Sequence, residues 1–134
     1  MVTQALPATA FDRKGHSGPA LRAFFRIAML WRLSVEEQMT LLGLTARSTF
    51  FRWKKNPDTI LPKDTLERIS YILGIYRALQ LLLPDQQAAD GWVRRPNAVP
   101  LFGGRSALDR MLSGQVADLY VVRQYMDAQQ DGWA

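Results

Sequence analysis

The sequence contains no cysteine and a single histidine, His16. Without cysteine the chain cannot form a disulfide, a thiolate nucleophile or a cysteine-ligated metal site, and one histidine cannot build a histidine cluster. Long hydrophobic runs are absent as well, because the longest uncharged apolar run, residues 78–84, is far shorter than the roughly 20 residues that a membrane span needs. We therefore expect no metal, no cofactor and no membrane partner.

Signals of export and of enzymatic activity are equally scarce. Residues 1–10 are mildly apolar but have no basic segment before them and meet charged residues at 12–14, so we expect a cytoplasmic protein. With a single histidine, no pair of nucleophile and general base can be proposed from the sequence. The glycines of residues 103–106 lack the spacing of a nucleotide-binding loop and a preceding strand, and we interpret them as a tight turn. We predict that the protein is not an enzyme.

Positive charge is concentrated in the N-terminal part of the 134-residue chain, whose formal net charge is +5. Residues 1–55 hold nine Lys/Arg and three acidic residues, residues 56–91 hold three and five, and residues 92–134 hold five and four. A basic part beside a near-neutral remainder indicates a polyanion-binding part joined to a part with another task.

Apolar residues recur with the helical period in several segments, and no segment alternates with the period of two that is typical of a strand. The class is therefore all-α. Periodicity and capping signals predict helices at residues 18–32, 35–42, 46–54, 63–83, 85–93, 106–112 and 118–129. The long helix at 63–83 has a wide apolar face, which predicts a spine for both ends of the chain. We expect residues 1–17 to form a flexible arm.

Residues 35–55 have the organisation of a helix-turn-helix. Ser34 and Glu37 can form a capping box at the first helix, and Gly43 allows the tight turn that follows it. Thr45 can then cap the second helix. Two short helices joined in this way cross steeply, as in DNA-binding proteins.

The second of these helices is two-sided. At about 100° per residue, the side expected to face the core carries Ala46, Thr49, Phe50 and Trp53. The other side is almost wholly basic and supplies the candidate DNA-binding residues, which are Arg47, Ser48, Phe51, Arg52, Lys54 and Lys55. A helix that presents such a face fits the major groove of duplex DNA.

Side-chain chemistry suggests how these residues would share the task. Arg47 and Arg52 can each donate two hydrogen bonds to a guanine, and Ser48 can reach a base or a phosphate. The two lysines at the helix end are expected to contact phosphates. Phe51 either touches a thymine methyl group or packs on a neighbouring helix, and the sequence leaves both open. A solvated basic face on an ordinary helical hairpin is the alternative.

The C-terminal half carries a second pattern of motifs. In chain order they are Trp92, Pro96-Asn97, Leu101-Phe102-Gly103-Gly104, Ser113-Gly114 and Val122-Arg123-Gln124-Tyr125. Placed after a helix-turn-helix and the long helix, this order resembles the Xre/MbcA/ParS antitoxins of RES–Xre type II toxin–antitoxin systems, over about residues 20–130. Ala107 and Met111 stand where proline and leucine are usual in the family, which affects only capping and packing.

The resemblance implies a homodimeric antitoxin that binds a RES-domain toxin, which consumes NAD or transfers ADP-ribose from it, and blocks the toxin's active-site cleft. It also implies that the helix-turn-helix binds operator DNA and represses the operon. On this basis residues 18–84 are the DNA-binding and dimerisation domain, and residues 85–134 are the toxin-binding domain. The alternative is a stand-alone helix-turn-helix regulator without a toxin partner.

Arginine and aromatic side chains are frequent anchors of protein interfaces, and the C-terminal domain offers several. The candidate toxin-binding residues are Arg94, Arg105, Arg123, Tyr125, Asp131 and Trp133. The tail, residues 129–134, is expected to extend from the last helix and to enter the cleft of the toxin.

Overall fold

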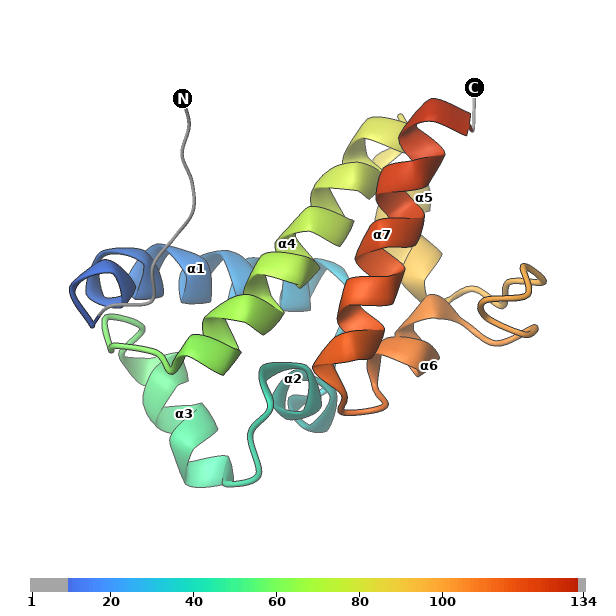
Figure 1. Ribbon diagram of the computed structural model, residues 1–134. Coiled ribbons are helices and arrows are strands. Elements are labelled where there is room, and N and C mark those ends of the chain that lie inside the picture. The colour runs from blue at the N-terminus through green and yellow to red at the C-terminus, as the bar shows by residue number, and fades with distance from the viewer. Residues whose placement is uncertain (1–9, 133–134) are drawn as a thin grey trace.

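The structure is a computed structural model that describes residues 10–132, with side chains from Gly15 to Asp131. Within this range the chain forms only helices and loops, as the all-α prediction requires (Figure 1). The elements are α1 Ala10–Leu30, α2 Val35–Leu42, α3 Arg47–Lys55, α4 Lys63–Leu82, α5 Gln86–Gly91, the 3-10 helix η1 Trp92–Arg94, α6 Ala107–Met111 and α7 Val116–Gly132.

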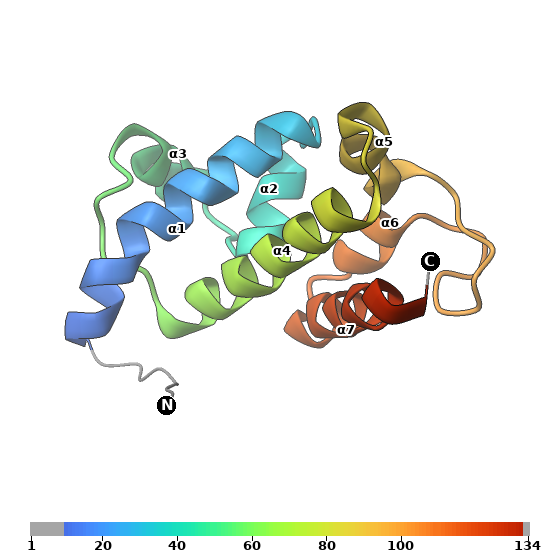
Figure 2. The ribbon, with the colours of Figure 1, turned by 90° about the horizontal axis from the view of Figure 1, so that it is seen from above.

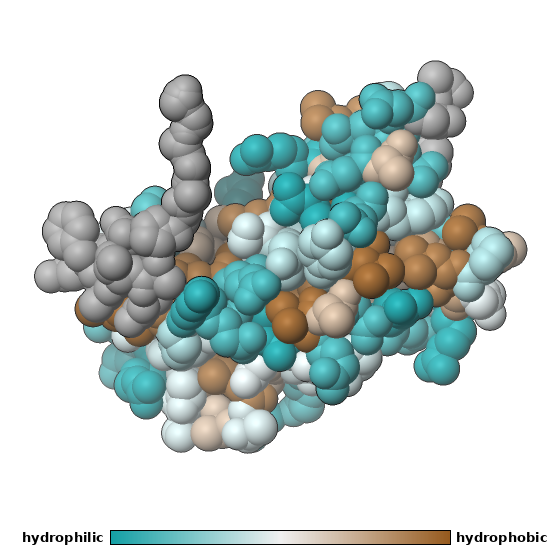
Figure 3. Space-filling view, viewed as in Figure 1, coloured by the Kyte–Doolittle hydropathy of each residue, from teal (hydrophilic) through white to brown (hydrophobic). Residues whose placement is uncertain are grey.

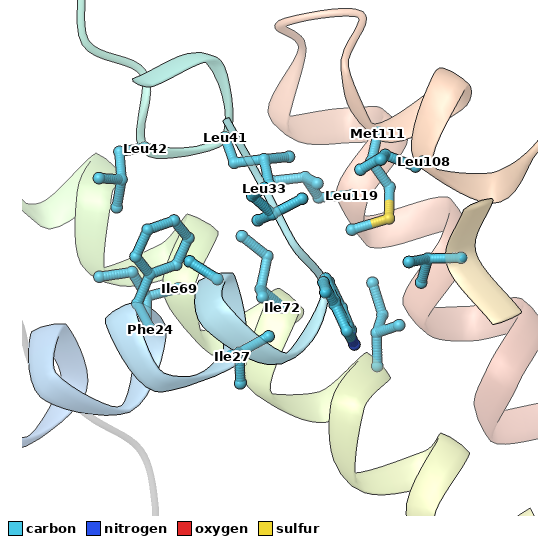
Figure 4. Packing of buried hydrophobic residues seen from close by; sticks show 14 of the residues in the cluster. Phe24, Ile27, Leu33, Leu41, Leu42, Ile69, Ile72, Leu108, Met111 and Leu119 are labelled. Atoms are coloured by element: carbon cyan, nitrogen blue, oxygen red, sulfur yellow. The ribbon is translucent and has the colours of Figure 1, made fainter. Parts of the chain in front are cut away.

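Helix α4 lies at the centre of the molecule, with α1 on one side and α7 on the other (Figure 2). Its buried residues include Ile69 and Ile72, which are completely shielded from solvent. Apolar side chains from both halves of the chain meet in a single core, in which Phe24 of α1 and Met111 of α6 belong to the same cluster (Figure 4). The prediction that this helix is a shared spine is confirmed.

Two helices begin with capping boxes that the local sequence specifies. At α2, the backbone N–H of Glu37 donates to Oγ of Ser34 at 3.0 Å, and the N–H of Ser34 donates to the Glu37 carboxylate at 2.9 Å. Ser106 and Asp109 form the same arrangement at α6. Gly43 ends α2 with a φ of 76°, in the left-handed region that favours glycine.

Helix α1 begins at Ala10, so the prediction of a flexible arm is wrong for residues 10–17. Ser17 is fully buried, and its Oγ accepts a hydrogen bond of 2.9 Å from the backbone N–H of Leu61. This contact is polar, so apolar periodicity could not detect it. Pro19 lies inside the helix. Residues 1–9 lie outside the described part of the chain.

Two further local predictions need correction. Thr45 does not cap α3, because Ala46 occupies the N-cap position with an extended backbone and no side-chain hydrogen bond is made there. Ala46 is consequently exposed instead of facing the core. Helix α7 continues to Gly132, so residues 129–132 are helical where an extended tail was predicted. The side chain of Gln129 donates to the carbonyl of Tyr125 within this last turn, at 3.2 Å.

Asp118 ties the start of α7 to the preceding helix. Its carboxylate accepts hydrogen bonds from the Ser113 hydroxyl at 2.6 Å and from Nε of Arg110 at 2.7 Å. The Ser113 hydroxyl, and then Arg110, hold the pKa of Asp118 below its ordinary value of 3.8. The charged form is therefore the one that the folded chain stabilises.

Stability is expected to fall in acid because of this carboxylate. Since the folded-state pKa of Asp118 lies below the unfolded value, its contribution is fully present above the unfolded pKa and is lost as the pH falls through the folded-state pKa. Urea midpoints measured between about pH 5 and pH 3 should fall less steeply for Asp118→Asn than for the wild type. Asp131→Asn, which removes the same charge from an exposed residue, is the control and should follow the wild type. Parallel curves for all three proteins would contradict this assignment.

Candidate functional site

Helix α3 is two-sided in the folded chain, as predicted. Phe50 and Trp53 are buried, with 2% and 5% of their surface exposed. The six candidate DNA-binding residues are all exposed, namely Arg47, Ser48, Phe51, Arg52, Lys54 and Lys55. The structure therefore brings these six residues together on one outer face, while Thr49 lies at its border with intermediate exposure.

Two cationic side chains of this face lie over aromatic rings. The Cζ of Arg47 lies 5.5 Å from the centre of the Phe51 ring, and Nζ of Lys54 lies 4.6 Å from the centre of the Phe25 ring of α1. Phe51 is itself half exposed and meets Phe50 edge to face, at 5.1 Å between ring centres. Phe51 thus packs on its own helix and still presents part of its ring to solvent.

Arg94, a candidate toxin contact, joins the two halves of the chain. Its guanidinium donates to the backbone carbonyls of Trp31 at 3.0 Å and Arg32 at 2.7 Å, and to the Glu37 carboxylate at 2.8 Å. Arg32 has a φ of 56°, which turns the chain between α1 and α2 at this point. Burial disfavours the charged carboxylate, but hydrogen bonds from Arg94 and Ser34 outweigh it and lower the pKa of Glu37.

Arg123 of α7 lies directly on Gly74 of α4. A Cβ at position 74 would collide with the guanidinium, so glycine is what permits this close approach. The same guanidinium pairs with Asp127 at 3.1 Å and donates to the carbonyl of Ser70 at 3.4 Å. Sequence reasoning missed this contact, since a glycine within a long helical pattern does not show which side chain will cover it.

Tyr125 belongs to a small aromatic cluster. Its ring stacks on Trp92 at 6.5 Å between centres with an interplanar angle of 17°, and meets Phe102 edge to face at 5.3 Å. Phe102 is buried, whereas Trp92 and Tyr125 are partly exposed. The Tyr125 ring therefore packs α7 against η1 and the loop that follows it.

That loop, residues 95–106, projects from the body of the molecule (Figure 1). It is held by Phe102, by paired backbone hydrogen bonds at Asn97 of 2.8 and 3.0 Å, and by Arg110, which donates to a loop carbonyl at 3.0 Å. The side chain of Arg105 is 77% exposed and pairs loosely with Asp109 at 3.6 Å. Hydrophobic surface gathers toward this side of the molecule, on the right of Figure 3.

The six candidate toxin contacts are therefore not equivalent. Arg94, Arg105 and Asp131 are exposed, but Arg94 is engaged in contacts within the chain, as are the partly buried Arg123 and Tyr125. Trp133 lies outside the described residues. Between residues 10 and 132 we find no helix long and apolar enough to cross a bilayer. Among the side chains that the structure describes, residues 15–131, no group of three acidic or histidine side chains is placed to hold a metal ion.

Two family models divide the described chain between them. Residues 10–74 match the antitoxin Xre-like helix-turn-helix domain, and residues 78–132 match the antitoxin Xre/MbcA/ParS C-terminal toxin-binding domain. The chain belongs to the Xre/MbcA/ParS antitoxin family. The resemblance drawn from the C-terminal motifs is thus confirmed, and the protein is an antitoxin of a toxin–antitoxin system with a helix-turn-helix domain. Neither domain family is a family of enzymes.

The antitoxin also has a similar curated relative. It is 57% identical, over 112 residues, to the uncharacterized protein y4oB of Sinorhizobium fredii, and the match covers 84% of each chain. The match extends over most of the length of both proteins.

Proposed function

We propose that this antitoxin binds and inhibits a RES-domain toxin that consumes NAD or transfers ADP-ribose from it, by covering the toxin's active-site cleft. In the same proposal it acts in the cytoplasm as a homodimer, represses its own operon by binding operator DNA, and catalyses no reaction itself. The observation that carries the proposal is the union, in one chain, of a basic recognition-type helix and a domain that matches a toxin-binding family.

DNA binding is proposed for the outer face of α3. The helix is short and stands at the edge of the molecule, so a groove can approach it without meeting the C-terminal half (Figure 1). Arg47 and Arg52 are assigned to base edges, and the lysines at the end of the helix are assigned to phosphates. We retain residues 18–84 as the DNA-binding and dimerisation part and residues 85–134 as the toxin-binding part.

Arg52→Ala is expected to weaken operator binding by about 1–3 kcal/mol, the usual worth of a bidentate guanine contact, and to relax base preference at one position. Lys55→Ala is the matched comparison on the same exposed face. It should weaken binding to every duplex alike and reduce the salt dependence. Fluorescence anisotropy titrations at two or more salt concentrations measure both effects. Equal, sequence-independent losses for the two variants would contradict the base assignment of Arg52.

Toxin binding is proposed to centre on Arg105 and the projecting loop of residues 95–106. A loop already held by backbone hydrogen bonds loses little conformational entropy when it binds. Arg105 brings a charge that is not tied tightly within the chain. Arg94, Arg123 and Tyr125 would contact the toxin only through the surface that their internal contacts leave exposed, and Asp131 would do so from the last turn of α7.

Co-expression with the product of an adjacent RES-type reading frame tests the proposal. The tagged wild-type antitoxin should co-purify with that protein, restore growth and restore the cellular NAD level. Arg105→Glu should weaken capture at least about tenfold if this side chain is a central contact, while Arg26→Glu, an exposed arginine of α1, should not. Full folding of the antitoxin without any capture would favour the stand-alone regulator.

A further inference from the structure

The face proposed for DNA carries a negative charge beside its first arginine. Glu36 lies in the first turn of α2, and its carboxylate pairs with Nη1 of Arg47, the first residue of α3. Both side chains are well exposed, at 73% for Glu36 and 56% for Arg47. The neighbouring Glu37 is directed elsewhere, to Ser34 and Arg94. Glu36 therefore stands where a polyanion would approach.

The guanidinium of Arg47 is held from two directions. Glu36 takes one of its donors, and the ring of Phe51, one turn further along α3, lies 5.5 Å from its central carbon. Phe51 is in turn placed by its edge-to-face contact with the buried Phe50. An arginine held in this way has already lost much of the rotamer freedom that a base contact would otherwise cost. Among the described residues only Nη1 of Arg47 donates a hydrogen bond from this guanidinium, so Nε and Nη2 are available to a further acceptor.

We infer that Glu36 and Phe51 are positioning residues that determine the DNA specificity of Arg47. The inference rests on the proposed binding of DNA by α3. Phe51 and Glu36 hold the guanidinium ready for a guanine, which accepts two hydrogen bonds at O6 and N7. Glu36 also lowers the affinity for every duplex, because its charge repels phosphates. Only a DNA sequence that offers a guanine to Arg47 offsets this repulsion. The carboxylate therefore increases the difference in affinity between the selected sequence and other sequences.

An ordinary surface ion pair would behave differently. Exposed pairs contribute little to stability, and removing the charge of such a pair would change the affinity for all duplexes by one common factor. The ratio of affinities for selected and unrelated DNA separates the two cases. That ratio is insensitive to small changes in folding, because both duplexes bind the same folded protein.

The test uses a duplex that the wild-type protein selects from random sequence, and a scrambled duplex of the same composition. For Glu36→Gln we expect tighter binding to the scrambled duplex and a fall in the selected-to-scrambled ratio of about fivefold or more. Phe51→Leu should lower the ratio while leaving scrambled binding unchanged, since no charge is altered. Glu67→Gln removes the same charge from α4, on its α7 side, and should leave the ratio unchanged.

A double substitution shows whether Glu36 acts through Arg47. In the background of Arg47→Ala, Glu36→Gln should raise the affinity for both duplexes equally and leave the ratio where it is. Melting temperatures close to that of the wild type are expected for all variants, because the substituted side chains are exposed. If the wild-type protein selects a duplex but Glu36→Gln changes both affinities by the same factor, the inference about Glu36 is wrong, while the proposed DNA binding by α3 still holds. If wild-type protein selects no duplex, the proposed DNA binding fails with it.

Discussion

Replacing Trp53 with alanine is expected to lower the free energy of unfolding by about 3–5 kcal/mol. The side chain is 5% exposed and lies on the inner side of α3, next to the buried Phe50. Truncation removes a large apolar volume, and the close-packed helices around it relax only partly into the space. Because the free energy of unfolding of an ordinary domain is only about 5–15 kcal/mol, such a loss removes a large part of it. Urea denaturation followed by circular dichroism measures the change.

Phe51→Ala is the matched control for that experiment. It removes an aromatic ring from the same helix, but one that is 48% exposed, so the cavity term is small and the loss of stability should be much smaller. A urea midpoint for Trp53→Ala close to that of the control would show that Trp53 does not fill the core.

Arg94→Ala is expected to produce the next largest loss, about 2 kcal/mol, after allowance for the 41% exposure of the side chain. Hydrogen bonds from a charged donor are stronger than neutral ones, and this guanidinium makes three of them across the two halves of the chain. Its removal leaves the carbonyls at the end of α1 and the carboxylate of Glu37 without this donor. Calorimetry gives the change in melting temperature and in cooperativity.

The neighbouring residue supplies the control for Arg94. Arg95 is exposed and forms no ion pair or hydrogen bond through its side chain within the described residues, so Arg95→Ala should leave stability almost unchanged. Arg94→Lys should fall between the two, because a single ammonium group does not match three separated acceptors. If the two alanine variants melt at the same temperature, the hydrogen bonds of Arg94 contribute nothing measurable to stability, and other contacts hold the two halves together.

Features that depend on neighbours in sequence were predictable here, and features that depend on distant partners were not. The capping box of Ser34 and Glu37 spans three residues, so its pattern is visible in the sequence. The bonds of Arg94 reach back 57 to 63 residues, and nothing around Arg94 marks its acceptors. Its predicted role as a toxin contact rested on residue type alone. The structure shows that this arginine instead connects two parts of the same chain.

The outer face of α3 was predictable because the helical period places residues from sequence number alone. The residue that was wrongly assigned to the core-facing side, Ala46, falls at the N-cap, where the backbone is not helical. The early start of α1 escaped notice because a buried hydroxyl, that of Ser17, anchors it. The close contact of Arg123 with Gly74 could not be foreseen either, since it depends on how α7 is set against α4.

The place where the two family matches meet, between residues 74 and 78, falls inside α4, Lys63–Leu82. The boundary between the two matched domains therefore does not coincide with a boundary in the packing, because α4 and the core run across it. A chimera of two antitoxins joined between residues 74 and 78 would take each half of α4 from a different protein. The C-terminal half of the helix would contribute the buried residues at positions 75, 78 and 79, which are Ile75, Ala78 and Leu79 in this chain. A new toxin-binding domain would then have to fit the resident α1 with that short stretch of α4, and its counterpart of Arg94 would have to find acceptors on the resident chain like those at Trp31, Arg32 and Glu37.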